Sequence, residues 1–129
     1  LDELFSCADV VSLHCPLTDQ TREIICRRNL GNMKDDVIIV NTSRGGLINE
    51  DDLLYALNNG KVGYAALDVF QSEPLKNIEL SGHKSVICTP HIAGNTYDSF
   101  SRMMRCAFEN IRLFDEGRLS EIEDRRITD

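Results

Sequence analysis

The sequence predicts an α/β fold built on a doubly wound parallel sheet. Four short apolar runs, at 10–13, 37–40, 64–67 and 86–88, are separated by segments with helical spacing. The runs are continuous rather than alternating, which is typical of strands buried on both faces. Strands that alternate with helices indicate βαβ units. We therefore expect about four strands with flanking helices.

The segment 49–59 carries the clearest helix end signals. Asn49 is a preferred N-cap residue, and the acidic residues at 50–52 suit the positive end of a helix dipole. Ile48 and Leu53 occupy the hydrophobic-staple positions, and Gly60 provides a stop. These signals predict a helix that begins just after Asn49.

The last helix is predicted from periodicity. Apolar residues recur at i, i+3, i+4 and i+7 spacing over 100–114, and Gly117 follows. Weaker patterns predict one helix near the N-terminus, over 1–8, and partial helix over 21–33.

Composition excludes several classes of protein. The chain has 129 residues, of which 42% are hydrophobic and 27% charged, so one packed domain is expected. The formal net charge of −7 argues against a general nucleic-acid binder. The longest apolar run, 37–40, is far too short to span a membrane, and no signal peptide opens the chain. We expect no nucleic-acid or membrane partner.

The five cysteines, an odd number, include no Cys-x-x-Cys pair. This spacing supports neither a zinc knuckle nor a thioredoxin motif. We expect reduced, buried thiols in a cytoplasmic protein and no metal site.

Polar residues gather where the predicted strands end. In open α/β sheets, ligands bind at the carboxyl ends of the strands. The segments that follow the four runs are His14-Cys15-Pro16, then 41–46 with Arg44, then Asp68 with Glu73-Pro74, and finally 89–94 with His91. One cation, two carboxylates and two imidazoles would thus share one edge of the sheet.

Each of these residues also has a purely structural interpretation. Arg44 has a planar fork that suits a carboxylate ligand, but it could equally form a salt bridge. His91 could exchange protons near neutral pH, or be an ordinary loop histidine. Glu73 could orient an imidazole, or be a solvated glutamate. Asp68 could make only a local turn hydrogen bond, and His14 only a backbone contact.

No Gly-x-Gly-x-x-Gly segment occurs in the chain. Gly45-Gly46 and the pair Gly60 and Gly63 do not fit that spacing. The sequence therefore shows no pyrophosphate-binding loop of its own.

Four segments together resemble the D-isomer-specific 2-hydroxyacid dehydrogenases. They are ADVVSLHCPLT (8–18), VNTSRGGLI (40–48), AALDVFQSEP (65–74) and TPHIAG (89–94), in the order and at the spacing typical of that family. The likeness runs from about residue 1 to residue 117. It implies a Rossmann-type fold, NAD as cofactor (with NADP not excluded), and hydride transfer between NAD and a 2-hydroxy or 2-keto acid.

The resemblance also implies roles for particular residues. Arg44 would hold the substrate carboxylate and keto oxygen, His91 would be the general acid/base, and Glu73 would pair with His91. The family's formate dehydrogenases carry glutamine at the Glu73 position, so a glutamate indicates hydroxyacid chemistry. Asp68 would bind the nicotinamide carboxamide. The remaining positions that would line the cofactor are Cys15, Pro16, Thr42, Ser43, Ala93 and Gly94.

The resemblance covers only part of such an enzyme. The family's glycine loop and most of its substrate domain have no counterpart here, so we interpret 1–117 as the C-terminal half of an NAD-binding domain. Residues 118–129 would form a mixed-charge tail. A fragment of this kind would be inactive by itself, and a homodimer is expected for the parent protein.

Two alternatives remain open at this level. Corepressors of the same fold sense dinucleotides and retain the Arg, Glu and His, although Gly94 favours the enzymes. An inert fragment is the other alternative. The sequence does not identify the acid, because the residues that select side chains belong to the missing domain.

Overall fold

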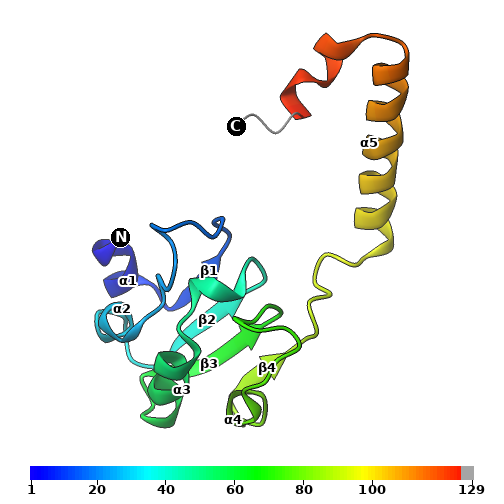
Figure 1. The fold of residues 1–129 in the computed structure, drawn as a ribbon. Coiled ribbons are helices and arrows are strands. Elements are labelled where there is room, and N and C mark those ends of the chain that lie inside the picture. The colour runs from blue at the N-terminus through cyan, green and yellow to red at the C-terminus, as the bar shows by residue number, and fades with distance from the viewer. Residues whose placement is uncertain (126–129) are drawn as a thin grey trace. The chain divides into compact units, whose positions relative to one another are not determined.

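The computed structural model describes residues 1–125 and divides the chain into two compact units. The first unit runs from Leu1 to Ala93, and the second begins at Gly94. Figure 1 shows the elements of each unit in chain order. The domain boundary expected at residue 117 remains a prediction.

The first unit is built on a four-stranded parallel sheet. Its strands are β1 (Val10–Leu13), β2 (Val37–Asn41), β3 (Val62–Leu67) and β4 (Val86–Cys88), in the spatial order β1-β2-β3-β4. The helices are α1 (Asp2–Cys7), α2 (Arg27–Gly31), α3 (Glu50–Asn58) and α4 (Ile78–Ser81), with a 3₁₀ turn, η1, at Gly45–Leu47. This arrangement confirms the predicted α/β class, and all four predicted strands are present.

Helix α3 has the predicted ends. The Asn49 side chain accepts a hydrogen bond from the Asp52 backbone N–H, as an N-cap does. At the other end, Gly60 has a φ of 72°, and the N–H groups of Gly60 and Lys61 donate to the carbonyls of Leu57 and Ala56. This is a Schellman turn, in which glycine tolerates the left-handed backbone at no steric cost.

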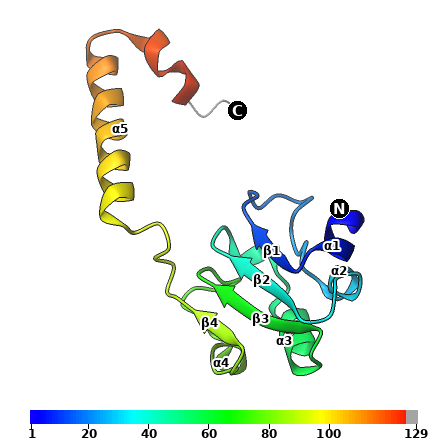
Figure 2. The ribbon, with the colours of Figure 1, turned by 180° about the vertical axis from the view of Figure 1, so that it is seen from behind.

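Burial differs between the two faces of the sheet. Residues of β1 and β2 alternate between buried and more exposed, and Val10, Tyr64 and Ile87 are more than half exposed. The expectation of strands buried on both faces is therefore wrong for residues 1–93. Successive strands are added in one direction, and right-handed crossovers then place the connecting helices on one face. Helix α3 lies in front of the sheet in Figure 1 and behind it in Figure 2.

Strand β1 lies at an edge of the four-stranded sheet, and the strands carry the exposed apolar side chains of Val10, Tyr64 and Ile87. An edge strand and exposed apolar surface both favour self-association. The 129-residue chain, produced alone, is therefore expected to associate with itself. Sedimentation velocity over a range of concentrations measures this, and Val10→Lys, which adds a charge to the edge strand β1, should shift the chain towards monomer. A monodisperse monomer with a cooperative melt would contradict the prediction.

The second unit contains the long helix α5 (Tyr97–Asp115) and a 3₁₀ segment, η2 (Leu119–Arg125). Thr96 caps α5 by accepting from the Ser99 backbone N–H, and Gly117, with a φ of 70°, ends the helix. The predicted helix over 100–114 is confirmed and is slightly longer. Of the tail expected over 118–129, residues 126–129 lie outside the described part of the chain.

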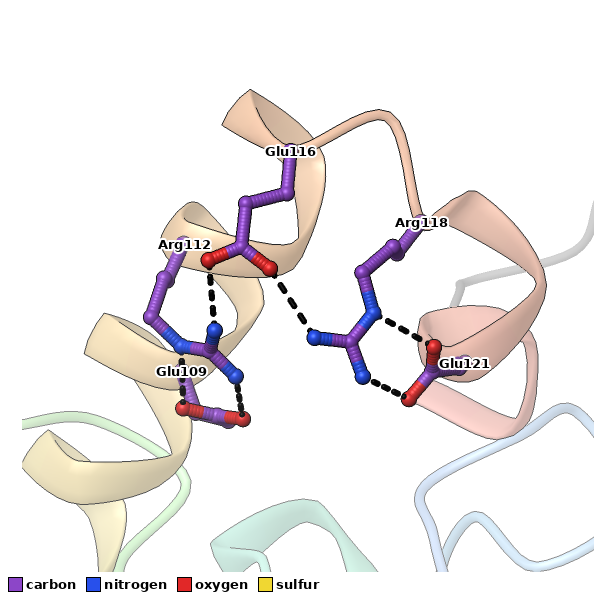
Figure 3. Close-up of polar contacts among 5 residues, drawn as sticks. All are labelled: Glu109, Arg112, Glu116, Arg118 and Glu121. Atoms are coloured by element: carbon purple, nitrogen blue, oxygen red, sulfur yellow. Dashed lines mark hydrogen bonds and ion pairs between the residues drawn. The ribbon is translucent and has the colours of Figure 1, made fainter.

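A chain of ion pairs crosses the turn at the end of α5, as Figure 3 shows. Arg112 bonds Glu109 and Glu116, and Arg118 bonds Glu116 and Glu121, so Glu116 is shared by both guanidinium groups. Hydrogen bonds from Arg118 and Arg112 lower the pKa of Glu116 below its usual value. These pairs therefore stabilise the turn at pH values above the ordinary pKa of glutamate. The stabilisation is lost as the pH falls through the lowered pKa of Glu116.

The cysteines differ from expectation. Cys7 and Cys106 are exposed, and Cys15, Cys26 and Cys88 are only partly buried, so none of the five is a fully buried thiol. All five are free. Across residues 1–125, no helix has the length and apolar character to cross a membrane.

Candidate functional site

The loops that follow the strands line one cavity of about 380 Å³. The loop after β1 contributes Leu17 and Arg22, and the loop after β2 contributes Arg44 to Gly46. The loop after β3 contributes residues from Val69 to Glu73, and His91 follows β4. The sheet therefore brings the predicted residues Arg44, Glu73 and His91 to one place.

Arg44 is held by its own loop. Asn41, a fully buried residue at the end of β2, donates from its side-chain amide to the Arg44 carbonyl and accepts from the Ser43 N–H. The Arg44 guanidinium bonds the Ser43 carbonyl at 2.7 Å. Within residues 1–122, no carboxylate lies within ion-pair distance of Arg44. The salt-bridge alternative therefore fails, and the cation is available to an anionic ligand.

Glu73 and His91 form a hydrogen-bonded pair, with 2.8 Å between Glu73 Oε2 and His91 Nδ1. Glu73 Oε1 also accepts from the Phe70 N–H at 3.2 Å. The bond to His91 and the bond from Phe70 hold the pKa of Glu73 below its usual value. Glu73 is therefore a carboxylate at neutral pH, and the stabilisation from this pair is lost as the pH falls through the lowered pKa.

The backbone of His91 is left-handed, with a φ of 55°. Such a conformation is uncommon for a residue other than glycine, and it persists where the surrounding structure holds it. Since Nδ1 faces Glu73, the other ring nitrogen, Nε2, is the one that can serve a ligand.

Asp68 fixes the loop that carries His91. Its carboxylate, 3% exposed, accepts hydrogen bonds from the Thr89 hydroxyl at 2.5 Å and from the backbone N–H groups of Ile92 and Ala93, each at 2.9 Å. Burial by itself would raise the pKa of Asp68, but these three bonds outweigh it and lower the pKa. Asp68 is thus a buried carboxylate that binds residues on both sides of His91 in the chain.

A second cavity, of about 300 Å³, adjoins the same pair. Leu75, Cys88 and Pro90 give it an apolar lining, and Glu73 and His91 line both cavities. The Glu73–His91 pair therefore lies between a polar cavity that contains Arg44 and a more apolar one.

The structure brings several of the predicted cofactor residues together. The Ser43 hydroxyl donates to the Cys15 carbonyl at 2.8 Å, which joins the Cys15-Pro16 and Thr42-Ser43 loops. Ala93 bonds Asp68 directly. Gly94 begins the second unit. Their roles in cofactor binding remain predictions.

Residues 1–93 match the family model for the NAD-binding domain of D-isomer-specific 2-hydroxyacid dehydrogenases. The chain belongs to this family. The match covers the whole first unit, including each of the loops that line the two cavities.

Relatives and a solved structure support this family assignment. A hydroxypyruvate reductase of Blautia hydrogenotrophica is 49% identical over 91% of this chain and 37% of its own length. A glyoxylate reductase of Aeropyrum pernix is 41% identical over 92% of this chain and 36% of its own length. The structure of a D-lactate dehydrogenase from Aquifex aeolicus, complexed with NAD and lactic acid, superimposes with a TM-score of 0.84 at 32% identity. The superposition covers 95% of this chain and 42% of the lactate dehydrogenase chain. The chain thus spans less than half the length of each of these proteins.

Three further residues of the candidate site were not singled out in the sequence analysis. Asn41 shapes the Arg44 loop, and its signal was an asparagine at the end of an apolar strand. Glu50 accepts from the Gln71 N–H at 2.7 Å and so anchors the loop that carries Glu73, which spacing in the chain does not reveal. Arg22 lines the Arg44 cavity, and its signal was a cation in the loop after the first strand.

Asp68 and the loop that it holds fit one part of an NAD site. Asp68 has a carboxylate acceptor beside the His91 loop, as a carboxamide ligand requires. A pyrophosphate cradle of the glycine-rich kind is absent from the sequence. Among the described residues, no group of three or more metal-binding side chains was found.

Proposed function

We propose that this chain forms the catalytic half of an NAD-dependent dehydrogenase domain that acts on D-2-hydroxy and 2-keto acids. The observation that carries the proposal is a cavity in which Arg44, with no carboxylate partner among residues 1–122, lies beside a glutamate–histidine pair. Arg44 supplies the cation that an acid substrate needs, and His91 supplies a proton donor and acceptor.

In the direction of reduction, a bound NADH would be the source of the hydride that C2 of the 2-keto acid takes up. Arg44 binds the substrate carboxylate and keeps C2 in place. His91 Nε2 donates a proton to the C2 oxygen, so that the keto group becomes a hydroxyl group. Glu73 holds the ring through Nδ1 and balances the positive charge of the imidazolium.

The other proposed cofactor contacts come from residues near this pair. Asp68 would accept from the nicotinamide carboxamide, in addition to its present bonds. The rest of the nicotinamide end of the cofactor would be lined by the loops at Cys15-Pro16 and Thr42-Ser43, together with Ala93 and Gly94. The experiments below use the native polypeptide, by which we mean this chain at the full length that its source produces.

The test is NADH oxidation, followed at 340 nm, by the native polypeptide with glyoxylate, hydroxypyruvate and pyruvate. NADPH is assayed in parallel. Turnover of at least one acid, and reverse oxidation of the D- but not the L-hydroxy acid, is expected. Tight NADH binding with no turnover of any acid would instead favour the corepressor class. The homodimer that the resemblance implies and the cytoplasmic location that the cysteines indicate remain predictions.

Arg44→Lys is expected to lower kcat/KM for the best keto acid by about 10- to 100-fold. Lysine keeps the charge but cannot form a bidentate contact, and one lost charged hydrogen bond has an effect of this size. NADH affinity should change much less. Arg28→Lys, on α2 and outside both cavities, is the matched control. An unchanged kcat/KM in Arg44→Lys would contradict the assignment of Arg44.

A further inference from the structure

Arg22 is a second cation in the cavity of Arg44. Neither arginine has a carboxylate within ion-pair distance among residues 1–122. Of the acidic residues whose side chains the structure describes, Glu73 alone lines this cavity, and it is bonded to His91. Once Arg44 has bound one carboxylate, Arg22 is therefore still available in the same cavity for a second anionic group.

The loop that carries Arg22 is tied down at several points. The Arg22 N–H donates to the Thr18 carbonyl at 2.9 Å, and the Thr21 hydroxyl donates to the Pro16 carbonyl at 2.6 Å. These bonds close a turn directly after Pro16 and place Arg22 at its end. The position of its backbone is therefore defined by the fold.

The same loop is fixed to the segment that follows Arg44. The Glu23 N–H donates to the Gly46 carbonyl at 2.9 Å, and the Ile25 N–H donates to the Leu47 carbonyl at 3.0 Å. Glu23 has a left-handed φ of 51°, a conformation that the surrounding bonds must maintain. The backbones next to Arg22 and Arg44 are thus held in register, as two cations that bind one ligand would require.

We propose that Arg22 binds a second anionic group on the substrate. The preferred substrates are then 2-keto acids whose C3 substituent carries a carboxylate, a phosphate or a sulfonate. Arg44 takes the carboxylate at C1, and Arg22 takes the distal anion. This inference rests on the proposed function and narrows its substrate class.

A matched pair of keto acids tests the inference with the native polypeptide. Oxaloacetate and 2-oxobutyrate both have four carbons, but the distal carboxylate of the first is a methyl group in the second. We expect the wild type to have a higher kcat/KM for oxaloacetate. Arg22→Gln should lower the ratio of the two kcat/KM values by about 10- to 100-fold, the usual effect of losing a charged hydrogen bond. Arg22→Lys should restore part of the ratio.

Two controls distinguish an Arg22 that binds substrate from one that binds the cofactor or only adds positive charge. Arg28→Gln, which removes a cation outside both cavities, should leave the ratio unchanged. The anion could also be a phosphate of the cofactor, so NADH affinity is measured by fluorescence. Weaker NADH binding in Arg22→Gln, with equal losses for both acids, would overturn the inference, and so would a wild-type ratio below one. If the wild type reduces neither acid nor any other 2-keto acid, the proposed function itself fails.

Discussion

His91→Ala in the native polypeptide is expected to lower kcat by about 10²- to 10⁴-fold, the range typical of a general acid–base group. The dissociation constant of NADH should change far less. Since Nδ1 is bonded to Glu73 at 2.8 Å, Nε2 is the atom that would deliver the proton in the proposed reaction, and alanine has no replacement for it. Single-turnover kinetics at saturating NADH measures the step directly.

Two further variants make this result specific. His91 has a left-handed backbone, so part of the loss in His91→Ala could come from a loop that relaxes. Asparagine tolerates this conformation better than most residues and cannot act as a proton donor of the imidazolium type. His91→Asn should therefore be nearly as inactive as His91→Ala. His83→Ala, outside both cavities, is the matched control. A kcat close to wild type in His91→Asn would reject the assignment.

The strands of the first unit were predictable because their signal is local. Each short apolar run is followed by polar residues, such as Asn41 after the β-branched run 37–40, and the sheet contains each run at nearly the predicted bounds. The caps of α3 were predictable for the same reason, since Asn49 and Gly60 act on their own neighbours. The burial of the sheet faces was not predictable in this way, because it depends on which segments cover them.

The site was predictable to the extent that topology determines it. Parallel strands bring their carboxyl ends to one edge, so Arg44, Glu73 and His91 could be expected to meet before any distance was known. Support from Asn41 and Glu50 could not be expected. Their bonds depend on loop conformations, and nothing in the spacing of residues along the chain encodes them.

Gly45→Ala is expected to destabilise the native polypeptide by about 1–3 kcal/mol or more, as overpacking does. A Cβ at Gly45 would lie 1.9 Å from the Phe70 carbonyl carbon and 2.0 Å from its oxygen. Both are backbone atoms that a side-chain rotation cannot move away. The strain would displace either the loop of Arg44 or the loop of Glu73, so kcat/KM should fall together with stability. Urea denaturation and steady-state kinetics measure the two effects.

Two other glycines provide a graded control. A Cβ at Gly46 would meet a Leu17 methyl group at 2.8 Å, and a flexible side chain can move, so Gly46→Ala should cost less. A Cβ at Gly31, in the last turn of α2, would meet nothing within 4 Å, so Gly31→Ala should be neutral or slightly stabilising. The expected order of destabilisation is therefore Gly45, then Gly46, then Gly31. Equal effects at Gly45 and Gly31 would mean that close contact between the Arg44 and Glu73 loops does not hold the site together.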